Sequence, residues 1–272
     1  MKNVGSERPS LSIAERVGLV SFLIAILLLF FEVWLSVIPL AGFLLLCIGA
    51  PFFPRFGFYL PVISRGRSGK KAVALTFDDG PDPFSTPELL RLLSKHKMKA
   101  TFFVTGKKAS DHPELVKEIV LQGHAIGNHT NTHDNLILFR SHKRLLQEIA
   151  STQNVLGESG IITRAFRPPV GITGPRLRRV LRQLGLVNIN FSCRAFDGGN
   201  RWITNLSKKI LKRIRPDDII LLHDVRPKNK ALLSYWLNEI ELILSGIEAK
   251  GFTVLPLSAI IGRPVMISTR RD

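Results

Sequence analysis

The chain divides into two regions with different patterns of hydrophobic and polar residues. Residues 17–53 are almost wholly apolar, and Glu32 is the only charged residue among them. From about Lys70 onward, short apolar runs alternate with stretches in which apolar residues recur at helical spacing. This contrast predicts a hydrophobic N-terminal segment followed by a globular domain.

The apolar segment is long enough to cross a membrane. One continuous helix over 17–53 would reach roughly 55 Å, well beyond a hydrocarbon core of about 30 Å. We therefore expect either one span that continues along the interface or two short spans, with Pro39 and Gly42 as the place to break. The run is too long for an ordinary signal-peptide core and has no clear small-residue cleavage site.

Basic residues flank the apolar segment on both sides. They are Lys2, Arg8 and Arg16 before it, and Arg55, Arg65, Arg67, Lys70 and Lys71 after it. Two basic flanks suit a hairpin with both ends in the cytoplasm, whereas a single span would place the domain opposite the N-terminus. We expect a protein of the bacterial cytoplasmic membrane, and the sequence leaves the side of the domain open.

The globular region alternates predicted strands and helices. The strand-like runs are Ala72–Phe77, Ala100–Thr105, His124–Gly127, Arg164–Phe166, Leu186–Cys193, Ile219–Leu222 and Thr253–Leu255. The helix-like stretches are Pro87–His96, Pro113–Gln122, Lys143–Leu156, Pro175–Leu184, Leu206–Ile214 and Leu232–Ala249. This alternation is typical of parallel βαβ units, so we expect a barrel or an open doubly wound sheet.

Charge and cysteine content narrow the class of protein. The formal net charge is +17, but the basic residues are scattered and no DNA-binding signature accompanies them. We therefore expect no nucleic-acid partner and assign the charge to solvated surface, with a bias toward anionic lipid head groups. Cys47 and Cys193 form no C-x-x-C pair, so we expect two buried thiols and no cysteine zinc site.

Polar residues follow the ends of several predicted strands. Asp78-Asp79-Gly80, His129 with His133, Arg167-Pro168-Pro169 and His223-Asp224 each come directly after a strand-like run, and Asp197 comes shortly after Cys193. The carboxyl ends of parallel barrel strands build one shared face. We therefore expect these side chains to meet at one site.

The residue types suit hydrolytic chemistry, although each has a structural alternative. His129 and His133, placed on one helical turn, could hold a divalent metal together with a carboxylate. His223 could act as a general acid. Arg167 could hold a carboxylate in a bidentate pair, or lie on the surface beside a turn stiffened by prolines. The Asp-Asp-Gly sequence is also common in turns.

Four motifs in order resemble those of one known family. They are T-F-D-D-G at 76–80, H-T-x-x-H at 129–133, R-P-P-V-G at 167–171 and L-L-H-D at 221–224. This set resembles the polysaccharide deacetylases of carbohydrate esterase family four, which include peptidoglycan, chitin and nodulation-type chitooligosaccharide deacetylases. The resemblance covers about Lys70 to Gly262.

The resemblance implies a fold and a set of residue roles. The fold is a distorted (β/α)7 barrel, here preceded by the membrane segment. Asp79, His129 and His133 would bind a divalent metal, zinc first, with cobalt, nickel or manganese as alternatives. In the remaining roles, Asp78 would be the general base oriented by Arg167, His223 the general acid paired with Asp197, and the Val170 N–H an oxyanion donor.

Two positions depart from the family pattern. Val170 stands where the family usually has Tyr, and only the backbone is needed for the oxyanion. Asp197 is separated from Trp202 by four residues, whereas the family's Trp lies close to its Asp. This spacing makes Asp197 the least secure assignment.

The sequence therefore predicts a metal-dependent N-deacetylase of an N-acetylated sugar in a cell-wall or surface polysaccharide. The alternatives are a deacylase of a lipid-linked sugar or glycolipid, and an inactive membrane-bound binding module. The expected domains are a tail (1–16), one span or a hairpin (17–53), a basic linker (54–69) and a catalytic domain (70–272).

Overall fold

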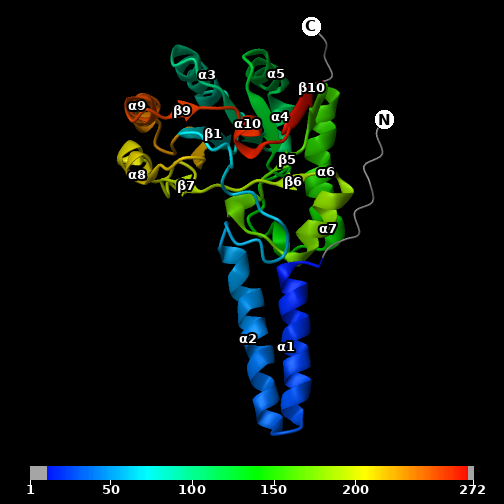
Figure 1. Cartoon of the computed structure of the whole chain (residues 1–272). Coiled ribbons are helices and arrows are strands. Elements are labelled where there is room, and N and C mark those ends of the chain that lie inside the picture. Colours follow the sequence, from blue (N-terminus) through cyan, green and yellow to red (C-terminus); the bar gives the residue numbers. More distant parts are fainter. Residues whose placement is uncertain (1–10, 269–272) are drawn as a thin grey trace.

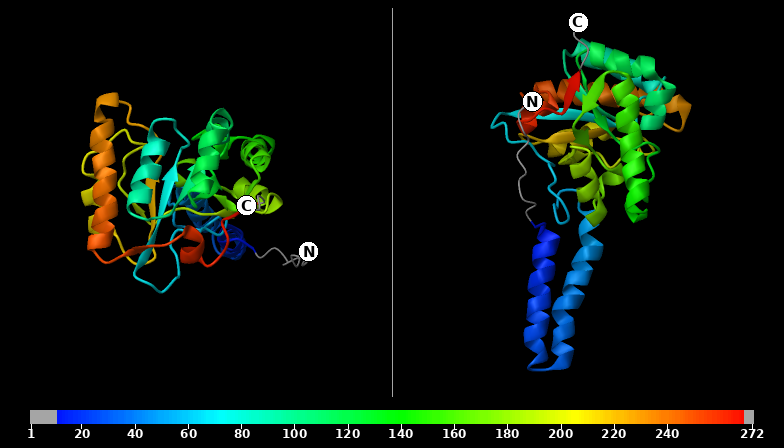
Figure 2. Two further views of the ribbon diagram at one scale, coloured as in Figure 1. Left: turned by 90° about the horizontal axis from the view of Figure 1, so that it is seen from above. Right: turned by 90° about the vertical axis from the view of Figure 1, so that its right-hand side faces the viewer.

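The computed structural model describes residues 11–268 and shows an apolar helical hairpin projecting from one end of an α/β domain (Figure 1). Helix α1 (Ile13–Leu29) runs away from the domain, and the 3₁₀ turn η1 (Val33–Ser36) leads into α2 (Val37–Gly49), which returns to it. A further 3₁₀ turn, η2 (Ala50–Phe52), ends the hairpin. The right-hand view of Figure 2 shows the same projection from another side, and the left-hand view looks along the hairpin from above.

The hairpin turns at a different place from the one predicted. The break lies at residues 30–32, between α1 and η1, whereas Pro39 and Gly42 both lie inside α2. Pro39 is tolerated because it sits in the first turn of α2, where its missing N–H has no intrahelical partner to lose. The two helices pack closely: a Cβ added at Gly18 would lie 2.9 Å from the Phe43 ring.

Most large side chains on the hairpin are exposed. The segment Val33–Phe52 has 20 residues and a mean hydropathy of 2.3, and is long and apolar enough to cross a membrane by length and composition. Only 11% of that segment is buried within the protein. At the domain end, Ser12 and Glu15 form a capping box that fixes the start of α1.

Parallel strands form the centre of the domain, as predicted. The strands are β1 (Ala72–Asp78), β2 (Ala100–Val104), β3 (Ala125–Asn128), β5 (Ala165–Phe166), β6 (Val187–Asn188), β7 (Cys193–Arg194), β8 (Ile219–His223) and β9 (Thr253–Val254). Their order is β6-β5-β3-β2-β1-β8-β7, with β9 added to β1. All these pairings are parallel. The arrangement confirms the distorted (β/α)7 barrel.

Helices surround the strands. The six predicted ones form as α3 (Ser85–Lys95), α5 (Pro113–Leu121), α6 (His142–Glu158), α7 (Pro175–Gln183), α8 (Leu206–Arg213) and α9 (Leu233–Ala249). The sequence reading missed α4 (Gly106–Asp111), α10 (Leu257–Ile261), the 3₁₀ turns η3 (Ile137–Phe139), η4 (Pro169–Gly171) and η5 (Lys230–Leu232), and the antiparallel pair β4 (Ile161–Thr163) and β10 (Met266–Ser268). The β1 side chains are all buried, which explains the continuous apolar run.

The predicted strand Leu186–Cys193 was wrong as a single element. Its two ends form β6 and β7, which pair with β5 and β8 at opposite edges of the sheet. The residues between them cross the gap where the barrel stays open. A single strand cannot pair at both edges, so the run divides.

The segment at 54–69 packs against this gap. Ile63 N–H donates to Asn188 O at 3.0 Å, and Asn190 N–H donates to Ile63 O at 2.8 Å. Phe58 and Leu60 are buried beside α7 side chains in one apolar cluster. The connection between the hairpin and the barrel is therefore a packed part of the domain.

Candidate active site

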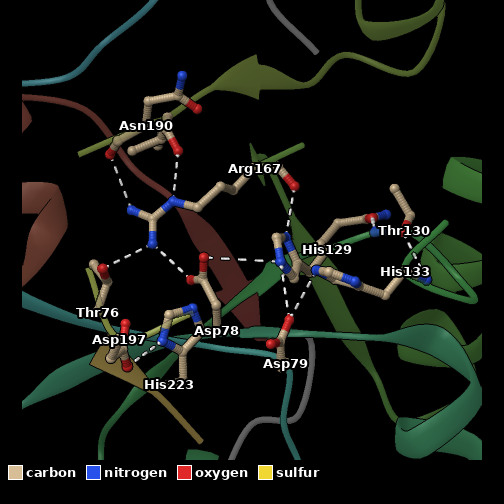
Figure 3. A network of polar contacts seen from close by, with 12 residues as sticks. Thr76, Asp78, Asp79, His129, Thr130, His133, Arg167, Asn190, Asp197 and His223 are labelled. Carbon is tan, nitrogen blue, oxygen red and sulfur yellow. Dashed lines mark hydrogen bonds and ion pairs between the residues drawn. The ribbon is translucent and has the colours of Figure 1, made fainter. Parts of the chain in front are cut away.

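The predicted polar clusters meet at the carboxyl ends of the strands. They line a cavity of about 560 Å³. Asp78, Asp79, His129, His133, Val170, Asp197 and His223 all contribute to its wall. Figure 3 shows how the polar side chains among them converge, together with Arg167 behind Asp78.

Asp78 is held by a fully buried arginine. Arg167 Nη1 donates to Asp78 Oδ1 at 2.6 Å and to Thr76 Oγ1 at 2.8 Å. The Nε and Nη2 atoms of Arg167 donate to the carbonyls of Ile189 and Asn190, both at 2.9 Å. The carboxylate therefore receives one guanidinium nitrogen and not the predicted bidentate pair, because main-chain carbonyls occupy the others.

Asp79, His129 and His133 form a three-residue cluster with the chemistry of a metal site. Asp79 Oδ1 lies 3.0 Å from His133 Nε2 and 3.3 Å from His129 Nε2. Each residue offers one ligand atom, and these atoms lie within 4.8 Å of one another. Two imidazoles and one carboxylate form a set that leaves positions open for water and substrate.

The hydrogen bonds around this cluster fit a cation. His129 Nδ1 lies 2.7 Å from Arg167 O, and a carbonyl only accepts, so Nδ1 carries the proton. In the neutral ring, Nε2 then presents a lone pair toward Asp79. Asp79 Oδ1 is buried and makes no hydrogen bond. Two facing lone pairs need a positive charge between them, which a divalent ion supplies.

The two histidines do not lie on a helical turn, contrary to the prediction. They follow β3 in a loop, in which Thr130 and His133 have φ of +66° and +55°. Asn128 Oδ1 accepts a hydrogen bond from the Thr130 N–H at 2.9 Å and fixes the first bend. The four-residue spacing therefore brings the imidazoles together by a left-handed loop and not by helical periodicity.

Asp79 is poised to ionise. Burial opposes ionisation, but when no metal is bound and the rings of His129 and His133 are protonated, their interaction with the carboxylate outweighs burial and holds the Asp79 pKa well below its usual range. Asp79 itself has φ of +73°, which turns its side chain away from the strand direction that Asp78 follows. The adjacent carboxylates thus face different partners.

Asp197 and His223 form a second polar pair in the cavity wall, near Asp78. His223 Nδ1 lies 2.8 Å from Asp197 Oδ2. Burial lowers the pKa of His223, but the hydrogen bond and charge of Asp197, with the charges of Asp79 and Asp78, raise it to about 9. A buried carboxylate beside a histidine keeps the ring protonated and oriented, which suits a proton donor.

Val170 occupies a strained position at the cavity mouth. It lies in η4, is 49% exposed and has φ of +52°. A β-branched residue rarely adopts this conformation, and such outliers gather at functional sites. The neighbouring Gly171 packs against Phe191 and Pro54, where an added Cβ would lie 3.2 and 3.3 Å away.

Sequence reasoning missed several residues that support the site. Thr76 and Asn190 accept hydrogen bonds from Arg167; Thr76 begins the first motif but received no role, and Asn190 stands outside the four motifs. Asp224 is in the fourth motif but received no role. It is buried and accepts hydrogen bonds from Ser85 and Thr86 at 2.7 and 2.6 Å, and its N–H donates to Asp78 O. Burial raises the pKa of Asp224 to about 7.

Comparisons with known proteins agree with this geometry. The family model described as polysaccharide deacetylase matches residues 65–189. A chitooligosaccharide deacetylase of Azorhizobium caulinodans is 33% identical over 204 residues, which cover 71% of this chain and 96% of that protein.

Solved structures show the same fold. The crystal structure of a peptidoglycan N-acetylglucosamine deacetylase has a TM-score of 0.67 at 29% identity and covers 75% of this chain and 94% of its own. A family 4 carbohydrate esterase from Streptomyces lividans, solved in complex with acetate, has a TM-score of 0.61 at 30% identity. That match covers 74% of this chain and 98% of the esterase chain. By sequence and by fold, the chain belongs to the polysaccharide deacetylase family.

Proposed function

We propose that this protein hydrolyses the acetamide of an N-acetylated hexosamine to a free amine and acetate. The observation that carries the proposal is that Asp78 and His223 line the same cavity as the Asp79–His129–His133 cluster. One is a carboxylate held by an arginine, and the other is a histidine held protonated by Asp197. Relatives named as chitooligosaccharide and peptidoglycan N-acetylglucosamine deacetylases support this substrate class.

The cluster fits a divalent cation, with zinc as the first candidate and cobalt, nickel or manganese as alternatives. When bound by Asp79, His129 and His133, the cation would polarise the acetamide carbonyl and make a water molecule more acidic. Each remaining step is assigned to a residue of the chain.

Asp78 acts as the general base. Arg167 holds the Asp78 carboxylate through Oδ1, and Thr76 in turn holds the Arg167 guanidinium. The other carboxylate oxygen, Asp78 Oδ2, lies 3.8 Å from His129 Nε2. Asp78 takes a proton from water as the water oxygen bonds to the carbonyl carbon. The Val170 N–H, at the cavity mouth, donates to the oxyanion that forms.

His223 acts as the general acid. An amide nitrogen leaves only after it is protonated, and the pKa of about 9 keeps His223 charged at neutral pH. Transfer of its proton to nitrogen accompanies cleavage of the C–N bond. The products are acetate and the sugar amine, and solvent exchange restores the two residues.

We further propose that the α1–α2 hairpin anchors the domain in a membrane. The 17 residues of α1 correspond to roughly 26 Å and the 20 residues of Val33–Phe52 to roughly 30 Å, close to the thickness of a hydrocarbon core. Glu32, the lone acidic residue of the run, lies at the turn, where it reaches the far head-group region.

A hairpin has a consequence for topology. Both of its ends lie on the side of the domain, and both flanks are basic, which favours the cytoplasmic side. A cytoplasmic domain is separated from the wall polymer by the bilayer. The hairpin therefore favours a lipid-linked sugar or glycolipid over a polysaccharide as the carrier of the acetamide.

The alternative of an inactive binding module has less support. Such a protein would be expected to lack one or more of the reacting groups. Asp78, Asp79, His129, His133 and His223 are all present and face one cavity.

Amine release tests the proposed reaction. The full-length protein in detergent is incubated with an N-acetylated chitooligosaccharide, with added zinc or with chelator. The full chain is used because residues 54–65 are packed into the barrel. We expect release of acetate and free amine that stops with chelator and returns with zinc. Release that persists in the Asp78→Asn variant would contradict the assignment.

Cysteine labelling tests the topology. Lys228 lines the cavity mouth, and a Lys228→Cys variant with Cys47 and Cys193 changed to Ser offers a single thiol. A membrane-impermeant maleimide should label it only after the cytoplasmic membrane is permeabilised. Labelling in cells whose outer layers alone are opened would place the domain outside and favour the polymer.

A further inference from the structure

A second cavity, which we call the basic groove, lies next to the active-site cavity. Its volume is about 630 Å³. It is lined by Phe53, Pro54, Arg55, Arg65, Phe191, Ser192, Cys193, Arg194, Phe196, Lys212, Arg213, Ile214 and Arg215. Phe191, Arg194 and Phe196 also line the active-site cavity, so the two cavities share part of their wall. The lining contains no acidic residue.

One wall of the basic groove is the chain that leaves the hairpin. Arg55, three residues after η2, donates through Nη2 to Ser192 O. Pro54 O accepts a hydrogen bond from Asn190 Nδ2 at 2.6 Å. The side chains of Phe52 and Phe53 are 62% and 64% exposed at this end of the hairpin. The groove therefore opens where the proposed membrane anchor meets the domain.

The positive charge of the groove is largely uncompensated. Arg65 pairs with Asp218 at 2.6 Å. Among residues 11–268, no ion pair joins a carboxylate to Arg55, Arg194, Lys212, Arg213 or Arg215. Unpaired arginines that share one cavity repel each other and attract an anion.

Aromatic rings place two of these arginines at the junction of the cavities. The guanidinium carbon of Arg194 lies 4.2 Å from the Phe196 ring centre and 5.2 Å from that of Phe191. The guanidinium of Arg213 lies 5.4 Å from the Phe196 ring. Burial and the nearby charge of Arg55 lower the pKa of Arg194. The charge of Asp197 offsets part of this effect, and an anion bound between Arg55 and Arg194 would relieve their repulsion.

We propose that the basic groove binds the phosphate group of a substrate whose N-acetylated sugar occupies the active-site cavity and whose lipid chain lies along the hairpin. This inference rests on the proposed deacetylase function and names its substrate class, a lipid phosphate-linked N-acetylhexosamine. Arginine presents a planar fork that matches phosphate oxygens. A neutral oligosaccharide has no group that needs this cavity, and a lipid chain needs the apolar hairpin beside it.

The test compares two substrates that differ in phosphate. Full-length protein in detergent micelles receives polyprenyl phosphate-linked N-acetylglucosamine or the neutral glycoside of N-acetylglucosamine with the same polyprenyl alcohol. In the wild type, kcat/KM should be higher for the phosphate-linked compound. In the Arg55→Gln/Arg213→Gln variant, the ratio of the two kcat/KM values should fall by about tenfold or more, mainly through KM. In the single Arg213→Gln variant, which keeps the contact of Arg55 with Ser192 O, this ratio should fall by a smaller factor.

The matched control removes the same charge elsewhere. Lys97 and Lys117 are exposed beside α3 and on α5, at the end of the domain away from the hairpin. The Lys97→Gln/Lys117→Gln variant should keep the wild-type ratio. An equal fall in this control, or an unchanged ratio in the groove variant, would overturn the proposal.

Binding separates this inference from the deacetylase function. Calorimetric titration with geranyl phosphate, with inorganic phosphate and with phosphatidylglycerol vesicles requires no turnover. We expect the groove variant to lose affinity for geranyl phosphate by about tenfold or more, with much weaker binding of inorganic phosphate in both proteins. Failure of the wild type to bind geranyl phosphate would refute the groove's role as a lipid phosphate site, whether or not the enzyme releases acetate. Equal effects on vesicle binding would assign the groove to bulk lipid and refute a substrate site.

Discussion

The two sides of the active site are held in different ways. The side of the proposed general base, Asp78 with Arg167 (the base side), is buried, and the guanidinium makes four hydrogen bonds to side chains and main-chain carbonyls. The side of the proposed general acid, Asp197 with His223 (the acid side), is joined by one side-chain hydrogen bond of 2.8 Å, with Asp197 in a turn after β7. The contacts on the base side therefore fix the position of the Asp78 carboxylate, while the contact on the acid side mainly raises the pKa of His223.

The metal cluster belongs to the base side, because His129 Nδ1 donates to Arg167 O. In the His129→Ala variant, we expect both bound metal and turnover to be lost, which is the largest effect predicted here. Elemental analysis of the purified protein and amine release measure the two. His142→Ala, on the first turn of α6, serves as the matched control and should lose neither. A variant that keeps full activity would exclude His129 as a ligand.

Removing only the proton acceptor should separate chemistry from binding. Asp78→Asn preserves shape and a contact to Arg167 but cannot take a proton from water. We expect kcat to fall by about 10²–10⁴-fold while metal content stays unchanged. Loss of metal together with turnover would instead make Asp78 a ligand.

A substitution on the acid side should change the pH dependence of the reaction more than the positions of the reacting groups. The raised pKa of His223 keeps its acid form up to about pH 9, so activity should decline as pH rises through that value. The Asp197→Asn variant lacks the carboxylate that mainly raises the His223 pKa, so the basic limb of the pH profile of kcat/KM should move to lower pH. At neutral pH we expect a loss of about tenfold. Asp111→Asn, at an exposed site, is the control, and an unmoved limb in Asp197→Asn would refute the pairing.

The smallest effect should come from Val170, which lines the cavity and is half exposed. Asn tolerates the left-handed conformation, so Val170→Asn should stabilise the protein by about 1 kcal/mol. The midpoint of urea unfolding measures this. Because only the backbone N–H is assigned a role, kcat should stay close to the wild-type value. A drop of about tenfold or more in a folded variant would assign a role to the side chain.

The sequence pattern predicts the inner part of the fold well, for a physical reason. Strands β1, β2 and β8 are almost wholly buried, so each appears as an unbroken apolar run. The pair β4 and β10 was missed because it has three-residue strands that join residues about 100 positions apart. Helix α4 was missed because its six residues begin with Gly and carry two lysines.

The same contrast applies to the site. Residues at strand ends, such as Asp78 and His223, were predicted to converge because parallel strands end on one face. The loop conformation that joins His129 to His133 depends on positive φ values that no spacing rule reveals. The contacts of Thr76 and Asn190 with Arg167 arise only when distant segments pack, so sequence alone gave no sign of them.

The hydrogen bond from Asn190 to Pro54 has a mechanical consequence. Asn190 also accepts from Arg167, so the end of the hairpin is two bonds away from the group that holds Asp78. The hairpin is thus held firmly against the domain and is not joined to it by a flexible linker. A domain on a flexible linker can reach any point within the length of that linker, whereas a rigidly held domain stays at a fixed distance from the bilayer. With the hairpin in a membrane, as proposed, the enzyme would accept a sugar ring that lies at this distance from the bilayer and not one that lies farther away.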